Sequence, residues 1–139
     1  HNGALIRETT AIALYMTDLF PKAGLGPTVG DPLRGPYLSW LAWYSGVLEP
    51  VLVHQAAGLE HPFLASTFRG FDEASAYLNA ALDRGPWLLG ERFSAADIVI
   101  HSPFSWFPEA IADNPKIADW VARCVDRPAM KSVAQRDAA

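Results

Sequence analysis

The chain has 139 residues, of which 50% are hydrophobic and 19% charged, and its formal net charge is -4. This length suits one domain with a real core, and an acidic balance without a cluster of Lys or Arg argues against nucleic acid or an anionic membrane as the main partner. No apolar run approaches the roughly 18 residues of a membrane-spanning helix. The single cysteine, Cys124, excludes an internal disulfide and fits a reducing cytoplasm.

The beginning of the chain shows no initiator Met. It starts with His1, and a helical pattern begins within about one turn of that residue. We therefore expect the chain to be part of a longer protein.

The first helix is predicted over residues 8–20. Ile12, Tyr15, Met16 and Leu19 fall at i, i+3, i+4 and i+7, which gives one apolar stripe. Residues 21–32 follow, rich in Pro and Gly, and their composition predicts a linker.

The start of this helix can bind a ligand or serve as an ordinary cap. A helix N-terminus presents unsatisfied amides and the positive end of the dipole, so it attracts a carboxylate. The hydroxyl of Thr9 adds a donor there, and the carboxylate of Glu8 can pair with an ammonium group. In the alternative interpretation, Thr9 caps the helix and Glu8 only complements the dipole.

A second, longer helix is predicted over residues 33–57, with a kink at Pro50, which cannot donate a backbone hydrogen bond. Tyr37, Trp40 and Tyr44 lie on its stripe, and Trp43 lies beside it. These aromatic residues occupy two faces, so not all of them can be core. A third helix is predicted over residues 65–83.

The most informative stretch follows at Ser94. The Ser94 hydroxyl can cap the first turn of a helix, and Asp97 can reach back to the Ser94 amide, which together form a capping box. Residues 98–100 are apolar on every side, which is typical of a helix in the middle of a core. Pro103 is expected to bend or end this helix. The cap accounts for Asp97, so we interpret it as structural.

A fifth helix is predicted over residues 115–125. No stretch shows the alternation of a strand. The fold class is therefore all-α, a bundle of about five to six helices. The histidines lack ligand spacing, so no metal site is expected, and Cys124 lies in an apolar stripe as a buried small side chain.

Several of these segments resemble one family. The run GPWLLGERFSAADIVI is similar to the segment that opens the central helix of the glutathione transferase C-terminal domain. RGPYLSWLAWYSGVLEPVL resembles the long helix of the bacterial enzymes more loosely. IADWVARCVDRPAMKSV resembles a late segment of the family, and this resemblance implies a last short helix after its Arg-Pro pair. RETTAIALY looks like the last helix of the thioredoxin-like domain that precedes it. The resemblance implies that residues 1–20 are that helix, 21–32 the interdomain linker and 33–139 the C-terminal helical domain.

The resemblance also implies a function. The longer protein would be a bacterial, cytoplasmic, homodimeric detoxification enzyme that joins the glutathione thiol to hydrophobic electrophiles. Glu8 would face the ammonium and Thr9 the carboxylate of the γ-glutamyl group, while Tyr37, Trp40 and Tyr44 would line the hydrophobic substrate pocket. The residue that activates the thiol lies upstream in this family, so no catalytic residue is assigned and the 139-residue chain alone should be inactive. The alternative is a non-catalytic assembly or regulatory module with the same fold.

Overall fold

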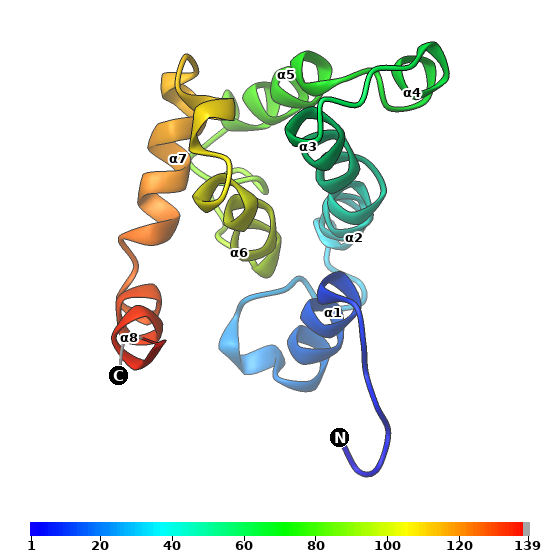
Figure 1. Cartoon of the computed structure of the whole chain (residues 1–139). Coiled ribbons are helices and arrows are strands. Elements are labelled where there is room, and N and C mark those ends of the chain that lie inside the picture. Colours follow the sequence, from blue (N-terminus) through cyan, green and yellow to red (C-terminus); the bar gives the residue numbers. More distant parts are fainter. Residues whose placement is uncertain (138–139) are drawn as a thin grey trace.

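The computed structural model describes residues 1–137, which form helices joined by loops and contain no named strand (Figure 1). Two isolated bridges, Trp87 with Gly90 and Leu89 with Arg92, are the β-type pairings of the described part. No helix among these residues is long and apolar enough to cross a bilayer. The predicted all-α class is confirmed.

The first helix, α1 (Thr9–Leu19), agrees closely with the predicted range. It ends where predicted: Pro21 opens a short 3-10 turn, η1 (Pro21–Ala23), and Gly24 follows with a left-handed backbone. The segment after this turn crosses to the central helix, where the Leu25 carbonyl accepts a hydrogen bond of 2.7 Å from the Ala95 amide. The predicted linker is thus fastened to the core.

The long helix runs continuously as α2 (Arg34–Trp43), a π-helical stretch η2 (Tyr44–Leu48) and α3 (Glu49–Ala56). Pro50 lies just after the π stretch. A proline inside an α-helix loses its own hydrogen bond and clashes with the carbonyl four residues earlier. The wider π turn, in which the Glu49 amide bonds to the Tyr44 carbonyl, accommodates this proline. The expected distortion at Pro50 therefore takes the form of a π stretch.

The third predicted helix, residues 65–83, is wrong in its extent. The structure has two helices there, α4 (Pro62–Phe68) and α5 (Phe71–Leu82). Arg69 and Gly70 separate them, with φ of 61° and 84°, and a left-handed backbone at two successive residues cannot continue a right-handed helix.

The central helix α6 (Ala95–His101) passes into a 3-10 turn, η3 (Ser102–Ser105), at Pro103. A further 3-10 turn, η4 (Pro108–Ile111), leads to α7 (Pro115–Val125) and α8 (Pro128–Asp137). With α2, η2 and α3 taken as one helix, the part from residue 33 to residue 137 has six helices. This number agrees with the predicted bundle.

The core forms around α6, which the long helix, α5 and α7 enclose (Figure 1). Ala96 and Ile100 of α6 have no exposed surface, and Trp120 of α7 is equally buried. At the N-terminal side of the bundle, α1 packs on α2 and α6. Nearly uniform burial of α6 explains its apolar sequence.

Candidate functional site

The start of α1 has the geometry of an anion-binding helix end. Glu8 is its N-cap, with φ 66° and ψ 123°, and no side chain caps the first turn. The first intrahelical bond runs from the Ile12 amide to the Glu8 carbonyl at 2.9 Å, which leaves the amides of the residues between them as orphan donors. Glu8 and Thr9 are both exposed, so their side chains are accessible to a ligand.

The backbone of Glu8 is strained. A positive φ in a residue with a side chain costs about 1–3 kcal/mol, and such residues concentrate at ligand-binding sites. The alternative interpretation, in which Thr9 is an ordinary cap, does not match this helix start, because Glu8 occupies the cap position and Thr9 is the first helical residue. The spacing of residues along the sequence did not predict this strained backbone.

Polar contacts hold α1 against the helical bundle. The Thr17 hydroxyl lies 3.1 Å from the Tyr37 hydroxyl, and Arg34 donates to both carboxylate oxygens of Asp18 at 2.7 and 2.9 Å. The hydrogen bond from Arg34 lowers the pKa of Asp18. A bidentate pair fixes direction as well as distance, so α1 has a defined orientation.

The opposite face of α1 is apolar and open. Ile12, Tyr15, Met16 and Leu19 are each between 38% and 47% exposed. They line a groove of about 470 Å³ together with the N-terminal segment, and the Tyr15 hydroxyl lies 2.6 Å from Nδ1 of His1. The predicted stripe of this helix therefore faces outward, while Ala13 and Leu14 pack against the core.

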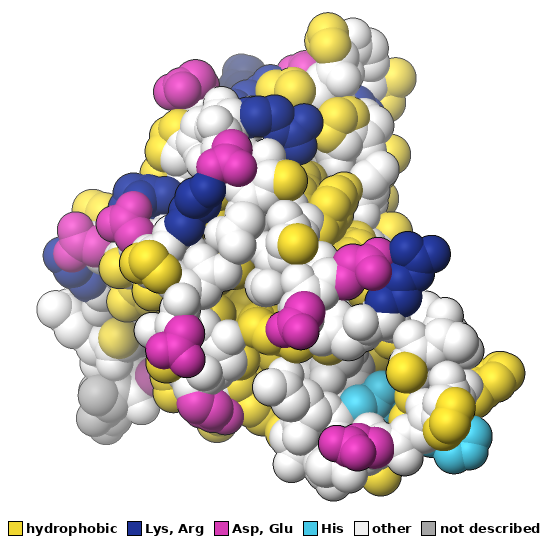
Figure 2. All heavy atoms as spheres, turned by 90° about the horizontal axis from the view of Figure 1, so that it is seen from above, with side chains coloured by type: hydrophobic (Ala, Val, Ile, Leu, Met, Phe, Trp, Pro, Cys, Tyr) yellow, Lys and Arg dark blue, Asp and Glu magenta, His cyan; other side chains and the backbone are white. Residues whose placement is uncertain are grey.

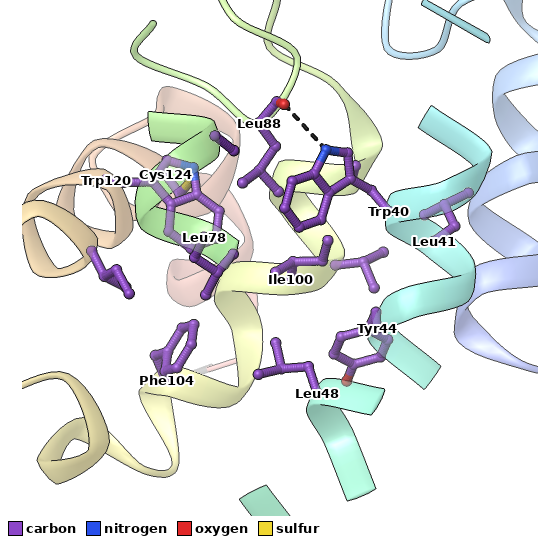
Figure 3. Close-up of a cluster of buried hydrophobic side chains, with 14 of the residues drawn as sticks. Trp40, Leu41, Tyr44, Leu48, Leu78, Leu88, Ile100, Phe104, Trp120 and Cys124 are labelled. Atoms are coloured by element: carbon purple, nitrogen blue, oxygen red, sulfur yellow. Dashed lines mark hydrogen bonds between the residues drawn. The ribbon is translucent and has the colours of Figure 1, made fainter. Parts of the chain in front are cut away.

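The three aromatic residues expected in a substrate pocket lie in the core. Tyr37 is fully buried, and its hydroxyl contacts Thr17. Tyr44 donates to Glu49 at 3.2 Å and is 7% exposed. Figure 3 shows Trp40 and Tyr44 directed inward among the buried side chains. The structure thus places Tyr37 and Tyr44 in packing rather than in a pocket wall, because almost no surface of either side chain is left for a ligand.

Trp40 also borders a depression at the surface. Its indole N–H donates to the Leu88 carbonyl at 3.2 Å (Figure 3), and one edge borders a surface depression of about 580 Å³. Tyr77, 44% exposed, lies across that depression with its ring centroid 4.6 Å from that of Trp40. The helix α5 therefore turns Tyr77 toward solvent.

Asp97 joins the loop before α6 to two helices. One of its carboxylate oxygens accepts from the Leu88 amide at 2.9 Å and the Trp120 indole at 3.0 Å. The other accepts from the Ser94 amide at 2.9 Å and the Ser94 hydroxyl at 3.2 Å. Ser94 in turn accepts from the Ala96 amide, which completes a capping box. Burial raises the pKa of Asp97, and the donors around it act in the opposite direction. A fully enclosed carboxylate has no route to a substrate, so Asp97 is structural.

The remaining reactive side chains form no site. Within residues 1–137, no group of three or more His, Cys, Asp or Glu side chains is arranged to hold a metal ion. Cys124 is buried, and burial raises the pKa of its thiol to about 12. At neutral pH the nucleophilic thiolate is therefore scarce.

Comparison with known proteins agrees with this architecture. Residues 60–128 match the family model described as glutathione S-transferase, C-terminal domain. Residues 60–128 therefore belong to the glutathione transferase C-terminal domain family. A curated relative from Escherichia coli strain K12, the disulfide-bond oxidoreductase YfcG, is 32% identical over 132 residues, which are 88% of this chain and 60% of the relative. The chain therefore spans about three fifths of the length of this relative.

Solved structures show the same arrangement of helices over nearly the whole chain. A glutathione transferase from Methylococcus capsulatus strain Bath is 26% identical, with a TM-score of 0.83 over 99% of this chain and 70% of that one. BphK, a bacterial glutathione transferase in a ternary complex, is 22% identical with a TM-score of 0.83, over 99% of this chain and 71% of that one. A sphingomonad glutathione S-transferase complexed with glutathione is 23% identical with a TM-score of 0.80, over 99% and 70% of the two chains. At these last two identities the likeness concerns the fold alone.

Proposed function

We propose that the chain is the helical part of a glutathione-dependent transferase, with a thioredoxin-like domain before α1. In this proposal residues 1–20 end that domain, 21–32 form the linker and 33–139 form the C-terminal domain. The observation that carries the proposal is the start of α1, where an uncapped helix end lies beside a strained, exposed Glu8. The open apolar face of α1 supports the presence of a further packing partner.

The γ-glutamyl end of glutathione fits this helix start by charge. It carries one carboxylate and one ammonium within a short distance of each other. The orphan amides and the Thr9 hydroxyl donate to the carboxylate, and Glu8 pairs with the ammonium. The chain then holds one end of the peptide, and the thiol extends toward the upstream domain.

The chemistry at sulfur would take place on residues outside this chain. A hydrogen bond to the thiolate lowers the pKa of the thiol. The thiolate attacks an electrophilic carbon of a hydrophobic molecule, a carbon–sulfur bond forms, and the leaving group departs with the displaced electron pair. Cys124 takes no part in this reaction, because it is buried and its pKa is about 12. Among the expected pocket residues, Trp40 is only 4% exposed but borders a surface depression, and we propose it as a substrate contact.

A second candidate reaction is the reduction of disulfides with glutathione, which is favoured by the similarity to the disulfide-bond oxidoreductase YfcG. Here the thiolate attacks a sulfur of the disulfide, a new disulfide forms, and the other sulfur leaves as a thiolate. Both reactions use the same glutathione site on α1. Assays of the longer protein with an aryl halide and with hydroxyethyl disulfide distinguish them, because each compound can undergo one of the two reactions.

The glutathione site is tested by substituting Thr9 in the longer protein. Thr9→Ala removes one hydrogen bond to a charged group, worth about 1.5–3 kcal/mol, so the affinity should fall roughly ten- to a hundredfold. Thr9→Ser keeps the hydroxyl and should change little.

Titration calorimetry with glutathione measures all three proteins. Equal affinities of the parent, Thr9→Ser and Thr9→Ala would refute the site. A parent with no affinity at all would favour the non-catalytic assembly module, which has no use for this ligand.

We also propose that the longer protein is a cytoplasmic homodimer that acts in detoxification. Dimerisation would cover the apolar surface that this chain leaves exposed. Sedimentation of the longer protein at micromolar concentration measures its mass, and a monomer there would contradict the proposal.

A further inference from the structure

A further cavity lies at the end of the bundle that carries α4, away from α1 (Figure 1). It has a volume of about 770 Å³ and lies between α3, α4 and the start of α5. This volume is within the range of sites that hold small organic molecules, about 300–1,000 Å³. Figure 2 looks onto this end and shows histidine side chains beside a hollow with hydrophobic side chains around it.

The backbone holds the cavity open. Gly58, with φ 61°, ends α3, and the next amide bonds back to the His54 carbonyl at 2.9 Å, as in a Schellman cap. Arg69 and Gly70 then turn the chain sharply between α4 and α5. The helix between these turns, α4, buries none of its residues. It is therefore fixed at both ends without filling the space beneath it.

The inner wall is apolar and aromatic. Val51 is buried, and Leu64, Phe68 and Phe71 are half-buried around the cavity. The His54 ring meets the Phe68 ring edge to face, with centroids 5.2 Å apart, and so joins α3 to α4. Water in such a hollow has few partners, so an apolar ligand that displaces it gains free energy.

The charged groups stay at the rim, outside the apolar inner wall. Glu60 and Asp72 are exposed there, and Arg69 pairs with Glu73 at 2.8 Å. The uncapped N-terminus of α5 opposes the charge of Asp72. A net charge on a ligand would therefore lose hydration in the cavity without a dedicated partner.

We propose that this cavity binds an uncharged, planar aromatic molecule that bears a hydroxyl or carbonyl group. Its rings lie against Phe68, Phe71 and the imidazole of His54, and its polar group hydrogen-bonds to His54 or Gln55 at the cavity wall. The site is separate from the start of α1 and does not depend on glutathione.

The test uses three probes with one ring system: phenanthrol, phenanthrene carboxylate and phenanthrenylmethylammonium. Amide chemical shifts of the ¹⁵N-labelled protein are followed during each titration. We expect saturable shifts confined to α3, α4 and the start of α5, and an affinity for the neutral probe about tenfold or more above that for either ion.

Ala65→Phe and Ala56→Phe provide the matched pair of variants. Ala65 lines the cavity, whereas Ala56, which is also exposed, lies on α3 and is not among the lining residues. Ala65→Phe should weaken binding of the neutral probe about tenfold or more by filling the cavity, and Ala56→Phe should leave it unchanged. The spectra themselves report whether each variant is folded. Absence of saturation, equal binding of the charged probes, or undiminished binding to folded Ala65→Phe would overturn the proposal.

Discussion

Replacement of Asp97 by Ala should be among the most destabilising single changes in this chain. Asp97 is fully buried and accepts four hydrogen bonds. Its loss leaves the amides of Leu88 and Ser94 and the indole N–H of Trp120 without an acceptor in the core. Each buried donor left unpaired costs about 1–3 kcal/mol.

The net loss is smaller than the sum of these costs. Removing the carboxylate also removes the penalty of keeping a charge away from water. We therefore expect Asp97→Ala to lower the free energy of unfolding by about 3–5 kcal/mol. A methyl group in place of the carboxylate also leaves a small cavity beside Trp120, which acts in the same direction.

Asp97→Asn is the matched control. The amide has nearly the same shape, but only one of its two polar atoms can accept a hydrogen bond. It can satisfy the donors on one side of the carboxylate and must turn its own N–H groups toward the others. We expect a loss of about 1–3 kcal/mol, clearly smaller than that of Asp97→Ala.

Urea unfolding, followed by tryptophan fluorescence and near-ultraviolet circular dichroism, measures these differences. Ser94→Ala removes the cap of the Ala96 amide and should cost about 1 kcal/mol. Because Ser94 and Asp97 share one capping box, the double variant should lose less than the sum of the single losses. Additive losses, or a loss below about 1 kcal/mol for Asp97→Ala, would refute this account of the network.

The remaining predictions concern pH and close backbone contact. Burial raises the pKa of Asp97 above 3.8 in the folded chain, so ionisation of this carboxyl favours the unfolded chain. The free energy of unfolding, measured relative to that of Asp97→Asn, should therefore fall as the pH rises from about 3.8 to the folded pKa. Above the folded pKa the difference should stay constant. Urea titrations across this pH range measure the difference, and a rise in that interval would show that the donors outweigh burial. Gly85→Ala should destabilise by about 1–3 kcal/mol, because its Cβ would lie 2.6 Å from the carbonyl carbon of Gly90. At Gly35, inside α2, an added Cβ meets no atom within 4 Å, so Gly35→Ala should be neutral or slightly stabilising. Equal changes in melting temperature for the two glycine variants would contradict the prediction.

Local signals in the sequence were sufficient for most helices. Pro115 at a first helical turn and the stripe after it predicted α7 with its observed bounds. The capping pattern of Ser94 and Asp97 likewise placed the start of α6. Each of these features depends on residues a few positions apart, so the pattern contains the information.

The same local reasoning could not predict contacts between segments that are distant in the sequence. Asp97 was expected to serve only its own helix, yet one of its oxygens bonds to Leu88 and Trp120, which are nine and 23 positions away. The division between α4 and α5 depends on a left-handed Arg69, and a side chain other than Gly or Asn rarely marks such a turn. Gly70 was the available signal, and it was read as part of a helix.

The candidate glutathione site also combines features that the sequence predicts with features that it does not. Sequence could place Glu8 and Thr9 at a helix start, because the apolar stripe after them is clear. It could not give the positive φ of Glu8, since a strained backbone is imposed by the structure around a residue and not by its own preference. The resemblance placed Tyr37 and Tyr44 in a pocket, but the spacing of aromatic residues along a helix does not tell which face turns inward.

The buried network around α6 is connected to α1 through a short series of contacts that ends at Asp18. The first amide of α6, at Ala95, binds the carbonyl of Leu25 and so anchors the linker. Two residues later the carbonyl of Pro27 accepts from Arg34, and the same guanidinium binds Asp18 of α1 at 2.7 and 2.9 Å. A site on a helix end is useful only if its donors point in a fixed direction. These contacts give α1 that direction, so the buried capping network around α6 supports the geometry of the helix start as well as the stability of the core.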